Sequence, residues 1–327
     1  MTQAIHSRLL ASLAVLGAAL VAGPAQATPP GSNGRIAFER PTRGDQPPSD
    51  LFAINPDGSA ETRLFAGPRH ESEAAFSPTQ SAVAFTREGS RTPPDIYVGD
   101  TATGQVSRLT RHRAFTSAPA FSPDGARIAY FTDKDFPPPS SDQSPPPPPE
   151  IYVMNADGSR QRRLTRDRLS SQDPDFSPDG RRIVYMESRA RGRGFQNRLV
   201  IIGSDGRNRR VLTRFGGANE VNAKWTPDGR RIVFELLRRG GTLSDIAMIG
   251  ADGAGLRRVL ATRAWETNPI PSPDGTKVVF TGDRDRRGRD RLGPGFELYT
   301  MNVDGTGITR LTNNRQPDVF PDWQRLP

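Results

Sequence analysis

Residues 121–130 read FSPDGARIAY, and this stretch decides the fold. Its Pro-Asp-Gly core is typical of a tight turn, because proline presets φ at the first turn position and glycine takes up the left-handed one. The segment after the turn is rich in β-branched and aromatic residues, which favour a strand. The stretch therefore predicts two strands joined by a short hairpin turn.

The same block recurs along the chain. Each copy ends one strand on an anchor residue, turns, and begins a second strand. The copies stand at residues 76–85, 176–185, 225–234 and 271–280, with a truncated copy at Trp323. Successive anchors lie 45 to 55 residues apart. A period of about 50 residues without a helical stripe predicts the blades of a β-propeller and not a helical solenoid.

Each repeat contains a second pair of strands. Residues 150–165 read EIYVMNADGSRQRRLT, in which two apolar segments flank an Asp-Gly turn. Similar segments occur in the other repeats, so each blade is predicted to hold four strands, which we call A to D in chain order. Strand A ends at the anchor.

The two ends of the chain determine the predicted number of blades. Residues 34–38, GRIAF, match strand B, whereas the chain closes on a strand A that ends at Trp323. We therefore expect residues 318–324 to join the sheet begun by residues 35–64, which would leave no open end in the ring. The prediction is an all-β, six-bladed propeller of four-stranded blades over residues 34–327.

The repeat resembles the WD40-like repeat of TolB-type propellers. The resemblance rests on the pattern aromatic-Ser-Pro-Asp-Gly-x-x-Ile-x-Phe, followed by Ile-Tyr-x-Met-Asn-x-Asp-Gly and Arg-Leu-Thr, and it recurs in all six blades. TolB of the Tol–Pal system carries an N-terminal α/β domain before its propeller. Only residues 28–33 precede the first strand here, so the resemblance implies a stand-alone propeller without that domain.

The first 27 residues have the pattern of a secretory signal peptide. Arg8 precedes an apolar run at residues 9–22, and Ala25-Gln26-Ala27 fits a small-x-small cleavage site. The run is shorter than the ~20 residues that cross a membrane. The sequence thus predicts an exported protein, periplasmic or extracellular and monomeric, with no transmembrane segment in the mature chain.

Composition excludes several classes of function. Hydrophobic residues make up 34% of the 327 residues and mean hydropathy is −0.61, which excludes a polytopic membrane protein. The absence of Cys excludes disulfides, thiolate nucleophiles and Cys-ligated metals, and three His leave little for His-based chemistry. No nucleophile elbow, zinc-protease or phosphate-loop motif is present. We therefore predict a non-enzymatic protein with no cofactor.

The loops on one face of the disc vary much more than those on the other. The A–B and C–D links are mostly short turns, whereas the B–C links differ in length and include a Pro-rich insertion at residues 136–149. Variable loops on a rigid ring are where binding surfaces usually lie. We expect the face that carries the B–C and D–A loops to bind a protein, a peptide or a component of the cell envelope.

Carboxylates gather at two positions that precede the anchors, and they predict an acidic channel mouth. Five residues before the anchors stand Glu71, Thr116, Ser171, Glu220, Glu266 and Asp318. Three residues before them stand Glu73, Ala118, Asp173, Asn222, Asn268 and Phe320. A ring of Glu71, Glu220, Glu266 and Asp318 would attract Ca²⁺ or a cationic peptide end. The alternative is that these residues cap their own strands or lie in solvent.

His70 and His112 occupy D–A loops of neighbouring blades and complete the predicted partner-binding set. A second hypothesis is a metal-dependent hydrolase or lyase that acts on an anionic polysaccharide, with its metal at the same mouth. A third is a purely structural domain without a ligand.

The net charge of +9 comes mainly from arginine, which is spread over both faces and the rim, so it favours a solvated surface. Export further argues against a nucleic-acid partner.

Overall fold

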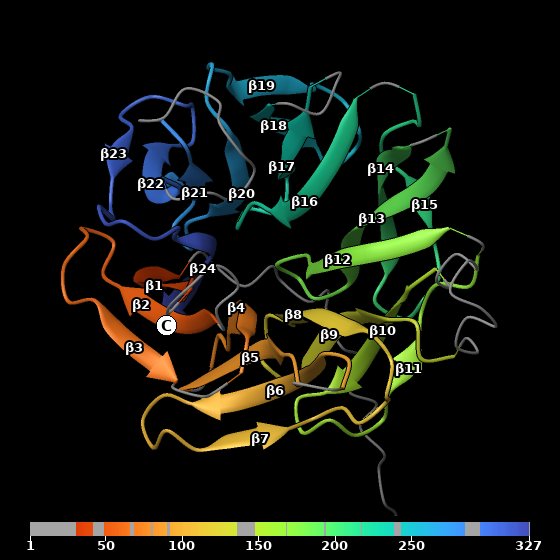
Figure 1. Ribbon diagram of the computed structural model, residues 1–327. Helices are drawn as coiled ribbons and strands as arrows, with labels where there is room; N and C mark the ends of the chain where they lie inside the picture. Colours follow the sequence, from red (N-terminus) through yellow and green to blue (C-terminus); the bar gives the residue numbers. More distant parts are fainter. Residues whose placement is uncertain are drawn as a thin grey trace, which may run out of the picture.

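The computed structural model is a ring of six antiparallel sheets around a central channel (Figure 1). The structure describes residues 31–41, 49–65, 69–79, 81–89, 92–135, 148–167, 169–192, 194–216, 218–238, 243–284 and 295–326. Within these ranges the chain forms 24 strands and no helix, and therefore no helix able to cross a membrane. The predicted all-β, six-bladed propeller is confirmed.

Each sheet has four strands, which follow one another from the channel outward. Blade 1 contains β24 (Val319–Leu326), β1 (Ser32–Pro41), β2 (Ser49–Ile54) and β3 (Thr62–Phe65). Blade 2 contains β4 (Glu71–Phe76), β5 (Ala82–Arg87), β6 (Asp95–Asp100) and β7 (Val106–Arg108). Blade 3 contains β8 (Thr116–Phe121), β9 (Arg127–Thr132), β10 (Glu150–Asn155) and β11 (Arg162–Arg163).

The second half of the ring repeats this order. Blade 4 contains β12 (Ser170–Phe176), β13 (Arg182–Arg191), β14 (Gly194–Gly203) and β15 (Arg210–Val211). Blade 5 contains β16 (Asn219–Trp225), β17 (Arg231–Leu237), β18 (Ser244–Gly250) and β19 (Arg257–Leu260). Blade 6 contains β20 (Glu266–Pro271), β21 (Lys277–Gly282), β22 (Glu297–Asn302) and β23 (Thr309–Arg310).

The two ends of the chain close the ring within blade 1, as the sequence predicts. β24 pairs antiparallel with β1, and Trp323 lies opposite Ile36. The Trp323 indole donates a hydrogen bond from Nε1 to the Gly34 carbonyl oxygen at 3.1 Å. The last strand therefore takes the innermost place of the first sheet, and the ring has no unpaired joint between its first and last blades.

The Ser-Pro-Asp-Gly motif builds the A–B turn. In blade 3 the Ser122 hydroxyl donates to Asp124 at 2.5 Å and accepts the backbone N–H of Arg127 at 2.9 Å. Gly125 has φ of 68°, which glycine adopts without steric cost. The same bonds occur in blades 4, 5 and 6, so the motif is a structural turn.

The Arg-Leu-Thr motif ties strand D to strand C. In blade 3, Thr165 Oγ1 accepts the backbone N–H of Ile151 at 2.9 Å. Arg163 donates to Glu150 Oε1 at 2.6 Å and to the Thr165 carbonyl at 2.8 Å. Blades 2 and 6 repeat this arrangement with their own acid, arginine and threonine. The repeated Arg-Leu-Thr motif therefore has a structural role within the blades.

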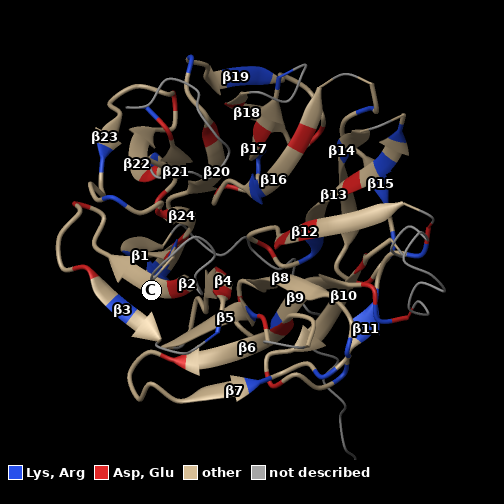
Figure 2. Ribbon diagram, in the orientation of Figure 1, with Lys and Arg blue, Asp and Glu red and all other residues tan. Residues whose placement is uncertain are grey.

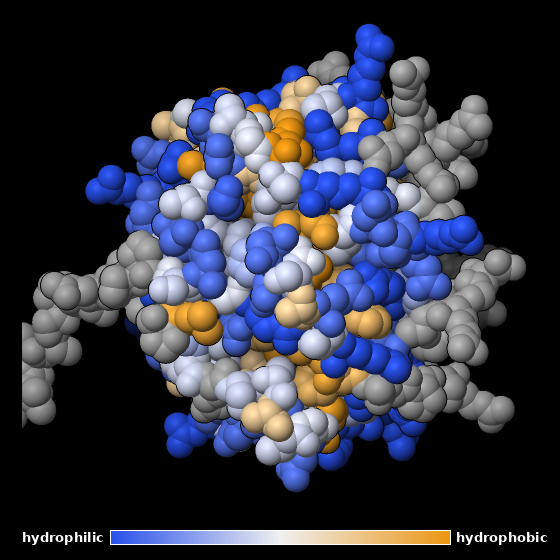
Figure 3. Space-filling view, turned by 90° about the vertical axis from the view of Figure 1, so that its left-hand side faces the viewer, coloured by the Kyte–Doolittle hydropathy of each residue, from blue (hydrophilic) through white to orange (hydrophobic). Residues whose placement is uncertain are grey.

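The apolar core lies between adjacent blades. Tyr185 of blade 4 is fully buried and packs in one cluster with Ile151 and Val153 of blade 3. Equivalent clusters fill the other blade junctions. On the side of the disc shown in Figure 3, hydrophobic residues form small separate groups in a mostly hydrophilic surface.

One B–C connection differs from the sequence-based expectation. The sequence predicts a loop at residues 186–197, but β13 and β14 continue their pairing outward until Arg191 faces Gly194. The ladder satisfies backbone groups that a loop would leave to water, and Gly192, with φ of 58°, permits the reversal. The signal peptide predicted at residues 1–27 and most of the Pro-rich insertion lie outside the described residues.

Candidate functional site: the central channel

The carboxylates five residues before the anchors lie at or next to the first residues of the inner strands. Glu71, Glu220, Glu266 and Asp318 are at most 3% exposed. None of them is among the residues that line the cavity in the channel. Their predicted metal or partner role stays a prediction, but the structure does not bring these four side chains together at a shared opening.

Three of the four are instead engaged by nearby side chains. Asp318 accepts two hydrogen bonds from Arg40, at 2.6 and 2.8 Å. Glu71 accepts two from Arg87, one of them at 3.1 Å. Glu266 lies 3.4 Å from Arg284 and accepts the Thr262 hydroxyl. Such pairs neutralise a carboxylate inside the protein and leave little charge for a ligand.

Burial also acts on their ionisation. Removal from water raises the pKa of Glu71, Glu266 and Asp318, and the adjacent Arg87, Thr262 and Arg40 respectively oppose the increase. Glu220 has no arginine partner among the described residues, and its burial raises its pKa to about 7. Burial therefore makes these groups costly to keep charged.

The two predicted histidines have different surroundings. His70 is partly exposed; its Nδ1 accepts the backbone N–H of Ser49 at 3.3 Å, and its Nε2 lies 3.7 Å from Glu39. His112 is half-buried, and this burial lowers its pKa. Neither lines the channel cavity, so their predicted partner contacts remain untested.

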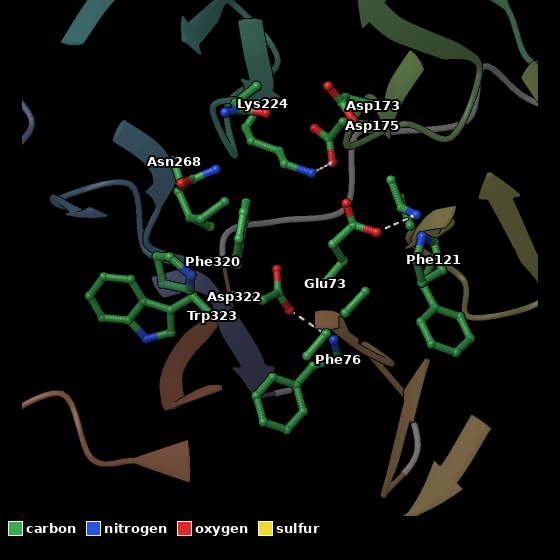
Figure 4. Close-up of a pocket in the computed structure, with 18 residues that line it drawn as sticks. Glu73, Phe76, Phe121, Asp173, Asp175, Lys224, Asn268, Phe320, Asp322 and Trp323 are labelled. Carbon is green, nitrogen blue, oxygen red and sulfur yellow. Dashed lines mark hydrogen bonds and ion pairs between the residues drawn. The ribbon is translucent and has the colours of Figure 1, made fainter. Parts of the chain in front are cut away.

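The channel contains a cavity of about 180 Å³ that is lined by the inner strand of every blade (Figure 4). Two sets of side chains surround it. The bulge ring, three residues before the anchors, consists of Glu73, Ala118, Asp173, Asn222, Asn268 and Phe320. The second ring, one residue before the anchors, consists of Ala75, Ala120, Asp175, Lys224, Ile270 and Asp322. The sequence singles out the bulge ring as oxygen-rich, and the structure places it on the cavity wall.

A β-bulge in each inner strand turns the bulge ring toward the channel. The pairing register shifts at this point in all six blades. Every residue of the ring has φ between 51 and 54°, in the left-handed region. Asp and Asn tolerate this region better than other residues with a side chain, which suits Asp173, Asn222 and Asn268. A repeated backbone irregularity thus aims one side chain per blade at the axis.

Three carboxylates of the channel also join neighbouring blades. Glu73 accepts the backbone N–H of Ala118 in the next blade at 2.8 Å. Asp175 accepts the N–H of Trp225 at 2.8 Å. Asp322 accepts that of Phe76, also at 2.8 Å (Figure 4). These bonds fix the side chains in the ring without cancelling their charge.

Asp173 differs from these three. It makes no hydrogen bond with any residue that the structure describes. Burial in the channel raises its pKa to about 7, with a further increase from the charge of Glu73 and a decrease from Lys224. Asp173 therefore lies on the channel wall without a hydrogen-bond donor among the described residues.

The channel lining is acidic although the chain is basic. Glu73, Asp173, Asp175 and Asp322 face the cavity with Lys224 as their only basic companion among the lining residues. Lys224 Nζ lies 3.9 Å from Asp175. Burial raises the pKa of Asp322 to about 6, and the charge of Lys224 opposes this. The lining can therefore attract a cation or accept hydrogen bonds.

An apolar pocket of about 250 Å³ adjoins the channel on the face of the B–C and D–A loops. Its walls are Val221, Leu237, Trp265, Phe296 and Phe320. It shares Asn222, Asn268 and Phe320 with the channel, and Glu235 lies at its polar side. Glu235 accepts a hydrogen bond from Asn222 at 3.0 Å and one from the Thr267 hydroxyl. The combined site has an apolar part beside an acidic part.

Sequence reasoning missed the second ring and this pocket. Asp175, Lys224 and Asp322 stand two residues after the bulge ring, so the alternation of side chains along strand A could have assigned both rings to the same face. The pocket combines residues of blades 5, 6 and 1 that lie far apart in sequence. No local sequence pattern predicts a pocket formed by residues of three blades.

The described residues offer no group of three or more His, Asp or Glu side chains that could hold a metal ion.

Comparison with known proteins agrees with this architecture. The solved structure of TolB from Acinetobacter baumannii superimposes with a TM-score of 0.69 at 22% identity, over 90% of this chain and 67% of that one. An oligogalacturonate lyase in complex with manganese superimposes with a TM-score of 0.57 at 16% identity, over 82% of this chain and 71% of that one. At these identities the likeness shows the fold alone.

Sequence matches narrow the assignment to a family. The Tol-Pal system protein TolB of Francisella tularensis subsp. mediasiatica is 32% identical over 195 residues, which is 58% of this chain and 41% of that protein. The chain spans between 25 and 41% of the length of the curated relatives that it matches. The TolB beta propeller domain matches residues 32–194 and 140–325. This protein belongs to the TolB β-propeller family.

Proposed function

We propose that this protein is an exported, non-enzymatic interaction module that binds an extended segment of a partner protein at the loop-face opening of its channel. The observation that carries the proposal is the charge of the lining: four carboxylates and one ammonium group in a chain of net charge +9. An acidic concavity in a basic protein is not a consequence of overall composition. It favours a partner with basic side chains or a free amino terminus.

The adjoining pocket supports a second feature of the partner. A cavity of about 250 Å³ with walls of Trp265, Phe296 and Phe320 suits one large apolar side chain. Asn222 and Asn268 lie between this pocket and the acidic channel. The proposed recognition element is therefore an apolar anchor residue followed closely by a basic residue. A periplasmic partner in the cell envelope is consistent with the family and with the predicted export signal.

The proposal can be tested with two labelled peptides of equal length, one carrying a tryptophan among lysines and the other a tryptophan among glutamates. Fluorescence anisotropy should show tighter binding of the basic peptide by the mature chain. Asp173→Asn should weaken that binding about tenfold, because it removes one unpaired carboxylate from the lining. Asparagine already occupies the equivalent places in blades 5 and 6, so the bulge should be retained.

Two control variants separate the channel from general charge. Asp157→Asn removes a carboxylate from an exposed C–D turn and should leave peptide binding unchanged. Leu237→Lys obstructs the apolar pocket and should weaken both peptides. Equal affinity for the basic and acidic peptides, or equal losses in Asp173→Asn and Asp157→Asn, would refute the channel as the binding site. Alanine changes at Glu71 or Asp318 are unsuitable, because each would remove a carboxylate that a partly buried arginine contacts, Arg87 or Arg40.

A further inference from the structure

A second cleft lies on the opposite face, among the tight turns of blade 4. It has a volume of about 600 Å³ and is lined by the start of β13, the end of β14 and the turn that leads to β15. Three of its side chains are arginines: Arg181, Arg182 and Arg210. Ser204, Asn208 and Ile201 complete most of its wall. Figure 2 shows the basic colouring of β15 at this edge of the blade.

Two of the three guanidinium groups are held in place by blade 5. The Arg182 guanidinium lies over the Trp225 ring, 4.6 Å from the ring centre. Arg210 donates to the carbonyl oxygens of Asp252, at 2.9 Å, and Ala251. The contacts of these two arginines are a ring face and backbone carbonyls, and the carboxylate whose pKa the charge of Arg182 lowers is Asp179, in the turn before β13. Both guanidinium groups are therefore held in place.

The remaining charged residues of the lining are Arg181 and Asp205, so the lining as a whole is positive. Arg181 is exposed and makes no hydrogen bond with its side chain to any described residue. Asp205 is the only carboxylate in the lining, and its Oδ1 accepts the backbone N–H of Arg207 at 2.9 Å within its own turn. The lining thus holds three guanidinium groups and one carboxylate, and Asp179, whose pKa the charges of Arg182 and Arg181 lower, is a second acid beside it.

The other blades differ at these three positions, although Arg162 of blade 3 donates to backbone carbonyls of blade 4 as Arg210 does to those of blade 5. The equivalent positions, read from the strand registers, are Gly34, Arg35 and Thr62 in blade 1, Ser81, Ala82 and Ser107 in blade 2, Ala126, Arg127 and Arg162 in blade 3, Arg230, Arg231 and Arg257 in blade 5, and Thr276, Lys277 and Thr309 in blade 6. Blade 5 repeats the three arginines but faces Pro271 as the next anchor, where blade 4 faces Trp225. Blade 4 alone combines three arginines with an aromatic support.

We propose that this cleft binds the phosphate group of a phosphate ester. Guanidinium groups donate paired, charge-assisted hydrogen bonds to tetrahedral oxyanions, and the Ser204 hydroxyl and Asn208 amide can donate to remaining oxygens. The volume exceeds what a free phosphate fills, and Ile201 offers an apolar wall for the organic part of the ester. The site is independent of the channel, because it lies on the opposite face and shares no lining residue with it.

The test uses the mature chain and inorganic pyrophosphate as a defined probe, with calorimetric titration at constant ionic strength. The double variant Arg181→Thr/Arg210→Thr introduces the residue types that blade 6 carries at the equivalent positions. It should lose apparent affinity about tenfold or more, because two charge-assisted contacts disappear. The control variant Arg111→Thr/Arg263→Thr removes the same charge from exposed residues of the D–A loops and should bind like the wild type.

Two outcomes would overturn the proposal: equal affinity in the wild type and the first variant, or equal losses in both double variants. The second would indicate attraction by net charge alone. If Arg181→Thr/Arg210→Thr fails to fold, Arg181→Glu changes only an exposed side chain without hydrogen bonds to the described residues and should still abolish binding. Retained binding in Arg181→Glu would equally exclude the cleft.

The source of the phosphate is then identified in a second assay. Sedimentation with phosphatidylglycerol vesicles, compared with phosphatidylcholine vesicles, tests a lipid headgroup. Competition by soluble glycerol phosphate tests a free ester. Vesicle binding that depends on Arg181 and Arg210 assigns the lipid, whereas binding of glycerol phosphate without vesicle binding assigns the soluble ester. Failure to bind either form would reject the phosphate ester as the ligand, even if pyrophosphate binds.

Discussion

At the scale of single residues, the left-handed positions of the bulge ring decide what the channel presents. Six non-glycine residues with φ of 51 to 54° lie at the same place in six strands. Two of them, Ala118 and Phe320, have side chains that cannot compensate by local hydrogen bonding. The strain is retained because backbone pairing on both sides of the bulge holds the residue in place.

Replacement of Ala118 by Gly should therefore stabilise the protein. Glycine relieves the left-handed strain and keeps the N–H that donates to Glu73. Glycine also loses more backbone entropy on folding than alanine, so we expect a net increase of about 0.5–1 kcal/mol in the free energy of unfolding. Urea denaturation measures the change in the free energy of unfolding. Ala120→Gly, in the same strand without positive φ, should instead destabilise the protein. A loss of stability in both variants would contradict the strain at Ala118.

At the scale of elements, strand β24 closes the ring. Trp323 is buried and packs in one cluster with Ile36 and Phe38 of β1 and with residues of blade 6. It thus connects the last blade, the first strand and the final strand of the chain. Loop closure over the whole chain depends on this contact, because no covalent link joins the two ends.

Trp323→Ala should reduce the free energy of unfolding by about 3–5 kcal/mol, the usual cost of removing a large aromatic side chain from a core. Thermal and urea denaturation of the mature chain measure this change. Phe195→Ala removes an aromatic ring that is 68% exposed and should change stability by no more than about 0.5 kcal/mol. A small effect at Trp323 would mean that the backbone pairing of β24 with β1 closes the ring without the indole.

At the scale of the whole molecule, blades that lie far apart in sequence set the ionisation of the channel. The pKa of Asp173 in blade 4 is raised to about 7 by burial first, then by Glu73 of blade 2. The unfolded chain releases this proton near pH ~3.9. Between these values the folded state holds a proton that the unfolded state has lost, so this group lowers stability as pH rises to about 7, and its effect is constant above.

Asp173→Asn should therefore stabilise the protein at about pH 8 by about 1–2 kcal/mol, with the gain disappearing near pH ~4. The figure is smaller than the full pKa shift implies, because water in the channel reaches the side chain. Asp157 provides the opposite case, since hydrogen bonds from Ser159 lower its pKa. Asp157→Asn should be less stable than the wild type at neutral pH, whereas the two proteins should be equally stable at low pH, where Asp157 is protonated. Urea denaturation across this range checks both signs.

The repeat, the strand order, the number of blades and the closure by the chain ends could all be predicted from the amino-acid sequence. These follow from local turn chemistry and from which strand stands at each end, and both are readable in FSPDGARIAY and its copies. The sequence also pointed to the oxygen-rich positions three residues before the anchors.

Which carboxylates face the channel could not be predicted from the sequence, because it depends on the folded backbone. A bulge adds one residue to the inner strand, so simple alternation cannot tell Glu71 from Glu73. The first is buried against Arg87, whereas the second faces the axis. The apolar pocket and the arginine cleft arise where neighbouring blades meet, and residues from distant parts of the chain come together only when the ring closes.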